Sequence, residues 1–79
     1  MFHKIVKLTT LPNYILCAEF GNGVIKTYNI GSLFEKYPVF QALQYNNLFS
    51  FAKIDMGGYG IVWNEEIDID AQEIYVNGK

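Results

Sequence analysis

Arginine is absent from the 79-residue chain, and cysteine, histidine and tryptophan each occur once. Without arginine, the protein cannot form the bidentate guanidinium contacts that many phosphate and guanine sites use. Its formal net charge of −2 at pH 7 also lacks the basic excess that binding to a nucleic-acid backbone requires. These features predict that nucleic acid is not a direct ligand.

Few residues are suited to metal binding or covalent catalysis. The single Cys17 cannot form an internal disulfide, and one cysteine with one histidine, His3, cannot build a four-ligand zinc site. We interpret Cys17 as a small residue buried in a strand. Neither Ser32 nor Ser50 lies in a G-x-S-x-G nucleophile turn. The sequence therefore predicts a protein that is not an enzyme, with no catalytic residues, no metal and no cofactor.

Long hydrophobic runs are also missing. No apolar stretch approaches the roughly 20 residues that span a bilayer, and residues 1–4 lack the apolar core of a signal peptide. We expect a cytoplasmic protein without membrane association. The length fits one domain, residues 1–79, which buries only roughly 60% of its surface on folding. Such a thin core disfavours an enclosed substrate cavity and favours help from a partner chain.

Hydrophobic alternation and turn residues predict antiparallel strands. Gly21-Asn22-Gly23 tolerates positive φ and joins the best-defined hairpin, and Gly57-Gly58 joins a second hairpin. Residues 11–13 break the chain between the first two strands. The predicted strands comprise residues 2–10, 14–20, 24–30, 49–56 and 59–63, with a shorter extended piece at 67–69.

The centre of the chain carries signals for helix. Ser32 followed by Glu35 matches a capping box and predicts a helical turn over residues 33–36. Proline cannot lie deep inside a helix, so we predict that a second helix begins at Pro38 and ends near Gln44.

These elements together predict an α+β fold. An antiparallel sheet built from two β-hairpins and an N-terminal strand packs one face on the central helix, residues 38–44, with Phe40 facing the sheet. Asp70 and Glu73 match a second capping box and predict a short C-terminal helical turn over residues 71–75.

An acidic stretch occupies the end of the predicted sheet. Its oxygens could hold a hard cation or act as paired carboxylates, which leaves open a small-ligand-binding or catalytic domain that uses residues 65–70. The spacing of a calcium loop is missing, and Ile67 and Ile69 alternate with the acids as in a strand. We interpret the stretch as a solvated strand edge followed by a helix N-cap.

Aromatic residues make up 16% of the chain, more than a thin core can hide easily. Tyrosine and tryptophan are enriched at interfaces because they combine a large apolar ring with a polar tip. Trp63 is therefore either a core residue or an interface residue. We predict a partner-binding surface around Tyr59, Trp63, Asp68 and Tyr75, where the neighbouring acids would suit a basic partner.

Several short motifs follow one another along nearly the whole chain: Asn13-Tyr14-Ile15-Leu16, Phe20-Gly21-Asn22-Gly23, Tyr28-Asn29-Ile30, Phe40-x-x-Leu43, Leu48-Phe49, Gly60-Ile61-Val62-Trp63-Asn64, Asp68-Ile69 and Ile74-Tyr75. In this order they resemble the bacterial domain-of-unknown-function family numbered 2442. That family commonly has a proline after the tryptophan and a glycine before the aspartate, whereas this chain has Asn64, Glu65 and Glu66 there.

The resemblance implies a binding role. Members of the family are small cytoplasmic bacterial proteins, often encoded beside another short domain of unknown function in an arrangement that resembles a toxin–antitoxin pair. We therefore expect a non-enzymatic protein-interaction or regulatory module, antitoxin-like in role. Its expected partner is a protein, either a second copy or the product of a neighbouring gene.

Overall fold

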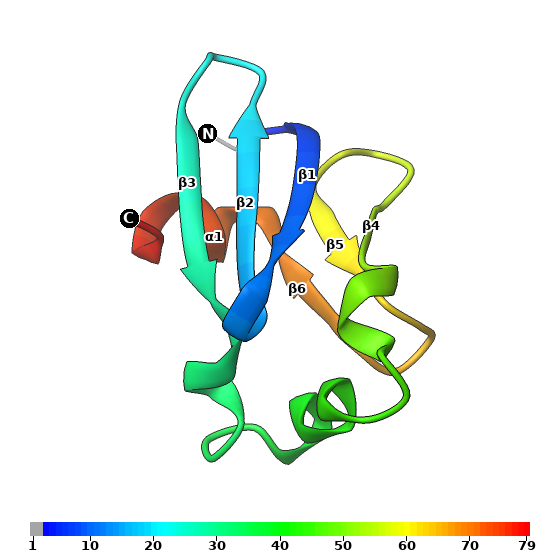
Figure 1. The fold of residues 1–79 in the computed structure, drawn as a ribbon. Helices are drawn as coiled ribbons and strands as arrows, with labels where there is room; N and C mark the ends of the chain where they lie inside the picture. The colour runs from blue at the N-terminus through cyan, green and yellow to red at the C-terminus, as the bar shows by residue number, and fades with distance from the viewer. Residues whose placement is uncertain (1–2) are drawn as a thin grey trace.

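Six strands form two three-stranded antiparallel sheets within residues 3–79, which the computed structural model describes (Figure 1). The first sheet runs in the order β1-β2-β3 and the second in the order β4-β5-β6. A C-terminal helix contacts strands of both sheets, and the predicted α+β class is confirmed. The elements are β1 (Ile5–Leu11), β2 (Ile15–Phe20), β3 (Ile25–Asn29), β4 (Lys53–Ile54), β5 (Gly60–Val62), β6 (Asp68–Asp70) and α1 (Ala71–Asn77).

The first hairpin is confirmed. Strands β2 and β3 pair with Cys17 opposite Thr27, and Gly23 adopts a φ of 89° in the turn that joins them. Alternation along β2 buries Leu16, Ala18 and Phe20, as the sequence pattern predicts. Tyr14 is not in the strand, because it lies in a 3-10 turn, Pro12–Tyr14, with a φ of 62°.

The predicted first strand is confirmed as β1, which pairs with β2. Its predicted start at Phe2 lies outside the described residues. The register shifts between Ile5 and Lys7, and such a bulge bends a strand away from further pairing. The backbone N–H of Ile5 donates to the Gly58 carbonyl at 2.7 Å, which links β1 to the loop before β5. The expectation of one continuous sheet is therefore wrong: the bend leaves two sheets in contact at this point.

The predicted strand at residues 49–56 is mostly wrong. A 3-10 turn occupies Leu48–Phe51, and only β4 is extended. Asn47, with a φ of 58°, starts the turn, and the Ser50 hydroxyl donates to the Asn47 carbonyl at 2.8 Å. This turn directs the Phe49 ring into the core. The turn at Gly57-Gly58 is confirmed, with Gly58 at a φ of 82°.

The central segment Pro38–Gln44 is helical as predicted, but it is a 3-10 helix and does not cover a sheet. Phe40 and Leu43, three residues apart, share one side of such a helix and are both buried. Phe40 packs edge-on against Trp63, whose ring stacks on Phe49. The green segment in Figure 1 accordingly lies beyond the ends of the strands, while α1 contacts β3, β5 and β6.

The first predicted cap is wrong and the second is correct. The Ser32 hydroxyl donates to the Asn29 carbonyl at 2.7 Å, inside a 3-10 turn over Ile30–Leu33 that precedes the predicted one. The predicted turn over residues 33–36 follows it and is closed by the Tyr37 N–H, which donates to the Leu33 carbonyl at 2.8 Å. Asp70 caps α1, since its Oδ1 accepts from the Gln72 N–H at 3.0 Å. The helix runs two residues further than predicted.

One hydrophobic core extends through both sheets, α1 and the irregular segment. Its most deeply buried large side chains include Ile5, Phe20, Ile30, Leu43, Ile61 and Ile74. Within residues 3–79, the structure has no helix of the length and hydrophobicity that crossing a membrane requires.

Phe40 provides a test of the packing around Trp63. Replacing Phe40 with alanine removes a ring that is 7% exposed, and we expect a loss of about 3–5 kcal/mol of unfolding free energy. The matched control is the adjacent Val39→Ala, since Val39 is 44% exposed and its truncation should cost less than about 0.5 kcal/mol. Urea unfolding measures both. Equal stabilities of the two variants would contradict this packing.

Candidate functional site

A groove of about 450 Å³ opens between the irregular central segment and the β6–α1 corner. Tyr28 of β3 also lines it, which places the groove where the two sheets and the helix meet. We call this feature the acidic groove; its chemistry comes from Lys36, Tyr37, Phe40, Asp68, Asp70 and Glu73.

Strand alternation places the carboxylates of β6. Ile69 is buried, whereas Asp68 and Asp70 on either side of it are exposed. A turn held by Asn64 precedes the strand, because the Asn64 Oδ1 accepts from the backbone N–H groups of Glu66 and Ile67 at 2.8 and 2.9 Å. The predicted strand edge and helix N-cap are therefore confirmed.

A hydrogen bond closes one wall of the groove. The Tyr28 hydroxyl donates to Glu73 Oε2 at 2.9 Å and so ties β3 to α1. Burial, followed by the hydrogen bond to Glu73 and the charge of that carboxylate, raises the pKa of Tyr28 to about 12. Tyr28 therefore remains a neutral donor at physiological pH, and Glu73 is held at the rim.

The groove is acidic overall. Its three carboxylates outnumber the one cation, Lys36, whose Nζ lies 5.7 Å from the centre of the Tyr37 ring. Among residues 3–79, no three histidine, cysteine or acidic side chains are placed to hold one metal ion. The carboxylates instead present separate hydrogen-bond acceptors along one wall.

Two of the predicted site residues lie together. Tyr59, 50% exposed, and Asp68 line a second hollow of about 450 Å³ on the outer side of β5 and β6. Asp55 also lines it, but its Oδ1 already accepts three backbone N–H groups from residues 57–59. All three residues of β6 line both hollows, so β6 forms the wall between the outer hollow and the acidic groove.

The other two predicted residues lie elsewhere. Trp63 is only 8% exposed, and its Nε1 donates to the Phe49 carbonyl at 3.0 Å, so the structure places it in the core and not on an open surface. Tyr75 is half-buried and stacks on His3 with ring centroids 3.7 Å apart. Neither ring is among the residues that line the acidic groove or the outer hollow.

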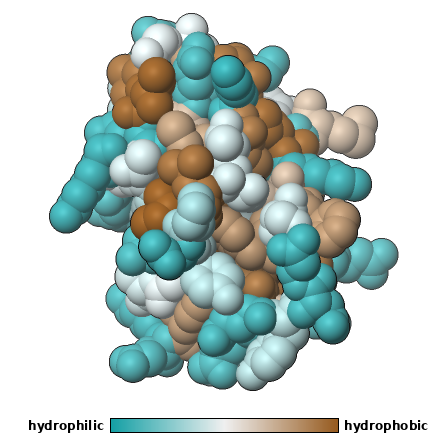
Figure 2. Space-filling model, in the orientation of Figure 1, coloured by the Kyte–Doolittle hydropathy of each residue, from teal (hydrophilic) through white to brown (hydrophobic). Residues whose placement is uncertain are grey.

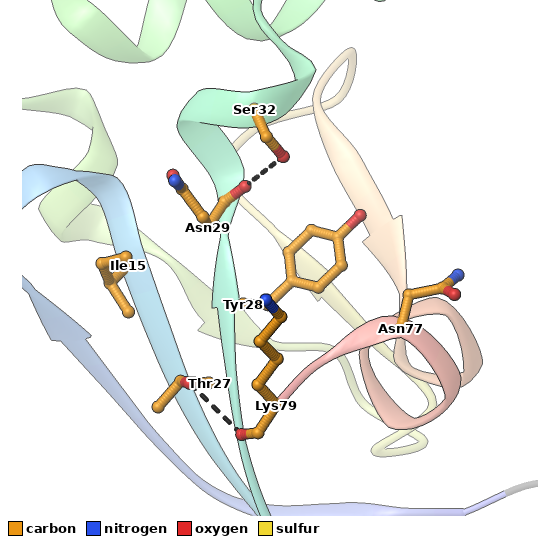
Figure 3. A pocket seen from close by; sticks show the side chains of 7 residues that line it. All are labelled: Ile15, Thr27, Tyr28, Asn29, Ser32, Asn77 and Lys79. Carbon is orange, nitrogen blue, oxygen red and sulfur yellow. Dashed lines mark hydrogen bonds between the residues drawn. The ribbon is translucent and has the colours of Figure 1, made fainter.

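A further hollow, of about 460 Å³, runs beside β3 (Figure 3). At one end Thr27 exchanges two backbone hydrogen bonds with Lys79, at 2.8 and 3.0 Å. At the other end the Ser32 hydroxyl closes onto the Asn29 carbonyl. The middle of the β3 edge is therefore already paired with Lys79 of the same chain.

One protein family matches nearly the whole chain. A family described as "Protein of unknown function (DUF2442)" matches residues 5–79. The chain belongs to the DUF2442 family. No curated protein and no solved structure gives a significant match. The predicted family resemblance is confirmed, and the chemistry of this DUF2442 protein has to be inferred from its own surface.

Sequence patterns did not identify Lys36, Tyr37 or Glu73 as site residues. Glu73 carries a capping-box signal but accepts from Tyr28, a residue 45 positions away. Lys36 and Tyr37 reach the groove only because the 3-10 segments fold back toward β6. No local motif encodes such a long-range approach. The aromatic-rich composition around Tyr37 is the one sequence signal that could have suggested it.

The raised pKa of Tyr28 gives a test of the Tyr28–Glu73 contact. The unfolded chain loses the Tyr28 proton near pH 10 and the folded chain near pH 12, so this contribution to stability is complete below pH 10 and disappears as pH rises toward 12. We expect the stability advantage of the wild type over Tyr28→Phe to shrink in urea titrations between pH 9 and pH 11.5.

The control is Tyr45→Phe, which removes the hydroxyl of a tyrosine that is 67% exposed. Its small difference from the wild type should stay constant over the same range. A pH-independent advantage over Tyr28→Phe would contradict the raised pKa.

Proposed function

We propose that this DUF2442 protein is a non-enzymatic interaction module that binds a protein partner in the acidic groove. The observation that carries the proposal is the combination, in one open groove, of carboxylates on one wall and an aromatic surface on the other. Tyr37 is 47% exposed beside the buried Phe40, against which it packs edge-on. A tyrosine held by a rigid neighbour is the type of side chain that dominates protein interfaces.

Charge supports a basic partner. Asp68, Asp70 and Glu73 outweigh Lys36, so a cationic segment is attracted to the groove and its approach is accelerated. The family resemblance favours a neighbouring gene product as this partner and a regulatory, antitoxin-like role. The spread of the acids along a wall suits a polypeptide better than a small cation, which needs converging ligands.

The molecule carries no single dominant apolar patch on the face shown in Figure 2. Hydrophobic side chains there form separate groups divided by hydrophilic ones. Large apolar patches that drive obligate association are not visible on this face. Recognition by charge and a few aromatic anchors is the mode that such a surface favours.

The exposed tyrosines allow a matched test. We expect Tyr37→Ala to weaken binding to the partner at least tenfold, because the ring forms part of the groove, whereas Tyr45→Ala should leave binding unchanged. The partner is first captured from the native host with the wild-type protein and identified. Its affinity for the wild type and the two variants is then measured by calorimetry.

Urea unfolding checks that both variants keep their fold. If Tyr37→Ala binds the partner as tightly as Tyr45→Ala does, the partner uses a different surface and the proposal is wrong.

A further inference from the structure

The hydrogen-bonding pattern of the second sheet leaves some backbone groups of β6 pointing away from β5. Trp63 N–H donates to the Ile67 carbonyl and Ala71 N–H to the Tyr59 carbonyl, both at 2.9 Å. In an antiparallel ladder the residues that bond to the neighbouring strand alternate, so Ile69 faces β5. The N–H and carbonyl of Asp68 and the N–H of Asp70 therefore point to the open edge, whereas the Asp70 carbonyl begins the hydrogen-bonding of α1.

This edge lies along the acidic groove. β6 is the last strand of its sheet, and all three of its residues line the groove. The edge of β3 differs, because Lys79 already pairs with Thr27 there. At the other side of the second sheet, β4 packs beside β1.

We propose that β6 accepts an extended, basic segment of the partner protein as a fourth strand of the second sheet. The proposal rests on the proposed function and adds its binding mode. Strand addition uses main-chain hydrogen bonds for affinity and alternate side chains for specificity. The groove of about 450 Å³ runs along all three residues of β6, so a segment of similar length can pair with this strand.

The alternation along β6 defines the sequence that fits. Side chains of paired strands share a face at opposed positions, so residues opposite Asp68 and Asp70 lie beside carboxylates. The residue opposite Ile69 points toward the core side of the groove, near Phe40. A basic, apolar, basic pattern in an extended segment satisfies all three positions.

A second copy of this chain is a poor occupant of the same edge. Two β6 strands paired with each other would place Asp68 and Asp70 of one copy near those of the other, and like charges opposed across strands are destabilising. Acidic side chains on an edge strand also discourage unwanted pairing. The edge therefore selects a basic strand over its own copy.

The direct test is amide hydrogen exchange with the blocked peptide lysine–valine–lysine–valine–lysine as the probe. In the free protein we expect rapid exchange at the amides of Asp68 and Asp70 and slow exchange at Ile69. With saturating peptide, the Asp68 and Asp70 amides should become protected at least tenfold, while Ile69 stays unchanged. Peptide that perturbs the groove without protecting these amides would overturn strand addition and leave the proposed function standing.

A pair of N-methylated peptides separates strand pairing from charge attraction. One carries backbone methyl groups on its lysines and the other on its valines, so both keep the same charge. Antiparallel pairing directs the lysine N–H groups toward β6, and we expect at least a tenfold loss of affinity for the lysine-methylated peptide only. A loss confined to the valine-methylated peptide would indicate parallel addition. Equal binding of both would overturn the proposal.

Matched acidic variants test the register. Asp68→Asn and Glu65→Gln each remove one negative charge, but Glu65 is an exposed residue that does not line the groove. We expect the peptide affinity to fall several-fold for Asp68→Asn and to stay unchanged for Glu65→Gln. Equal effects would mean that the peptide responds to overall charge, which overturns the proposed placement. The affinity of the natural partner for Tyr37→Ala tests separately whether the groove is the binding surface.

Discussion

Burial of Trp63 is the constraint on which the irregular half of the molecule depends. Its indole N–H needs an acceptor once it leaves water, and the Phe49 carbonyl supplies one at 3.0 Å. The Phe49 ring stacks on the indole with an interplanar angle of 27°, and Phe40 meets it edge-on. Two segments without regular hydrogen-bonded sheet or α-helix are thereby fixed against β5. The wall of the acidic groove that carries Tyr37 is held in place by this aromatic cluster.

Polar contacts position the opposite wall of the acidic groove. Asp70 ends β6 and starts α1, so the same residue terminates a strand and caps a helix. The helix then presents Glu73 to Tyr28. The hydrogen bond from the buried Tyr28 phenol orients this carboxylate at the wall of the groove. The position of Glu73 therefore depends on how α1 packs against β3.

Local signals were sufficient for some elements of this fold and insufficient for others. The hairpin around Gly23 and the cap at Asp70 depend on residues within three or four positions of each other, and both were predictable. The break into two sheets depends on a bulge near Val6 and on the approach of Gly58, which lies more than fifty residues away. At Phe49 a β-favouring composition was overridden, because a 3-10 turn directs its ring onto Trp63.

The residues of the candidate site also divide into those that local patterns predict and those that depend on long-range packing. Asp68 was predictable from alternation along an acidic strand, whereas Tyr37 and Glu73 enter through long-range packing. Tryptophan is a residue type that is enriched at interfaces. Only the packing of Phe49 and Phe40 around Trp63 determines that it belongs to the core.

The stack between His3 and Tyr75 brings the start of the described chain against the C-terminal helix. Closing a loop of this length has a large entropic cost that can be recovered only after the intervening strands have formed. The β1–β2–β3 meander, whose contacts are local, is therefore expected to fold first and α1 to dock last. In the native ensemble, opening of α1 would dismantle the Glu73 wall while the meander stays intact. One wall of the acidic groove thus belongs to the unit that docks last.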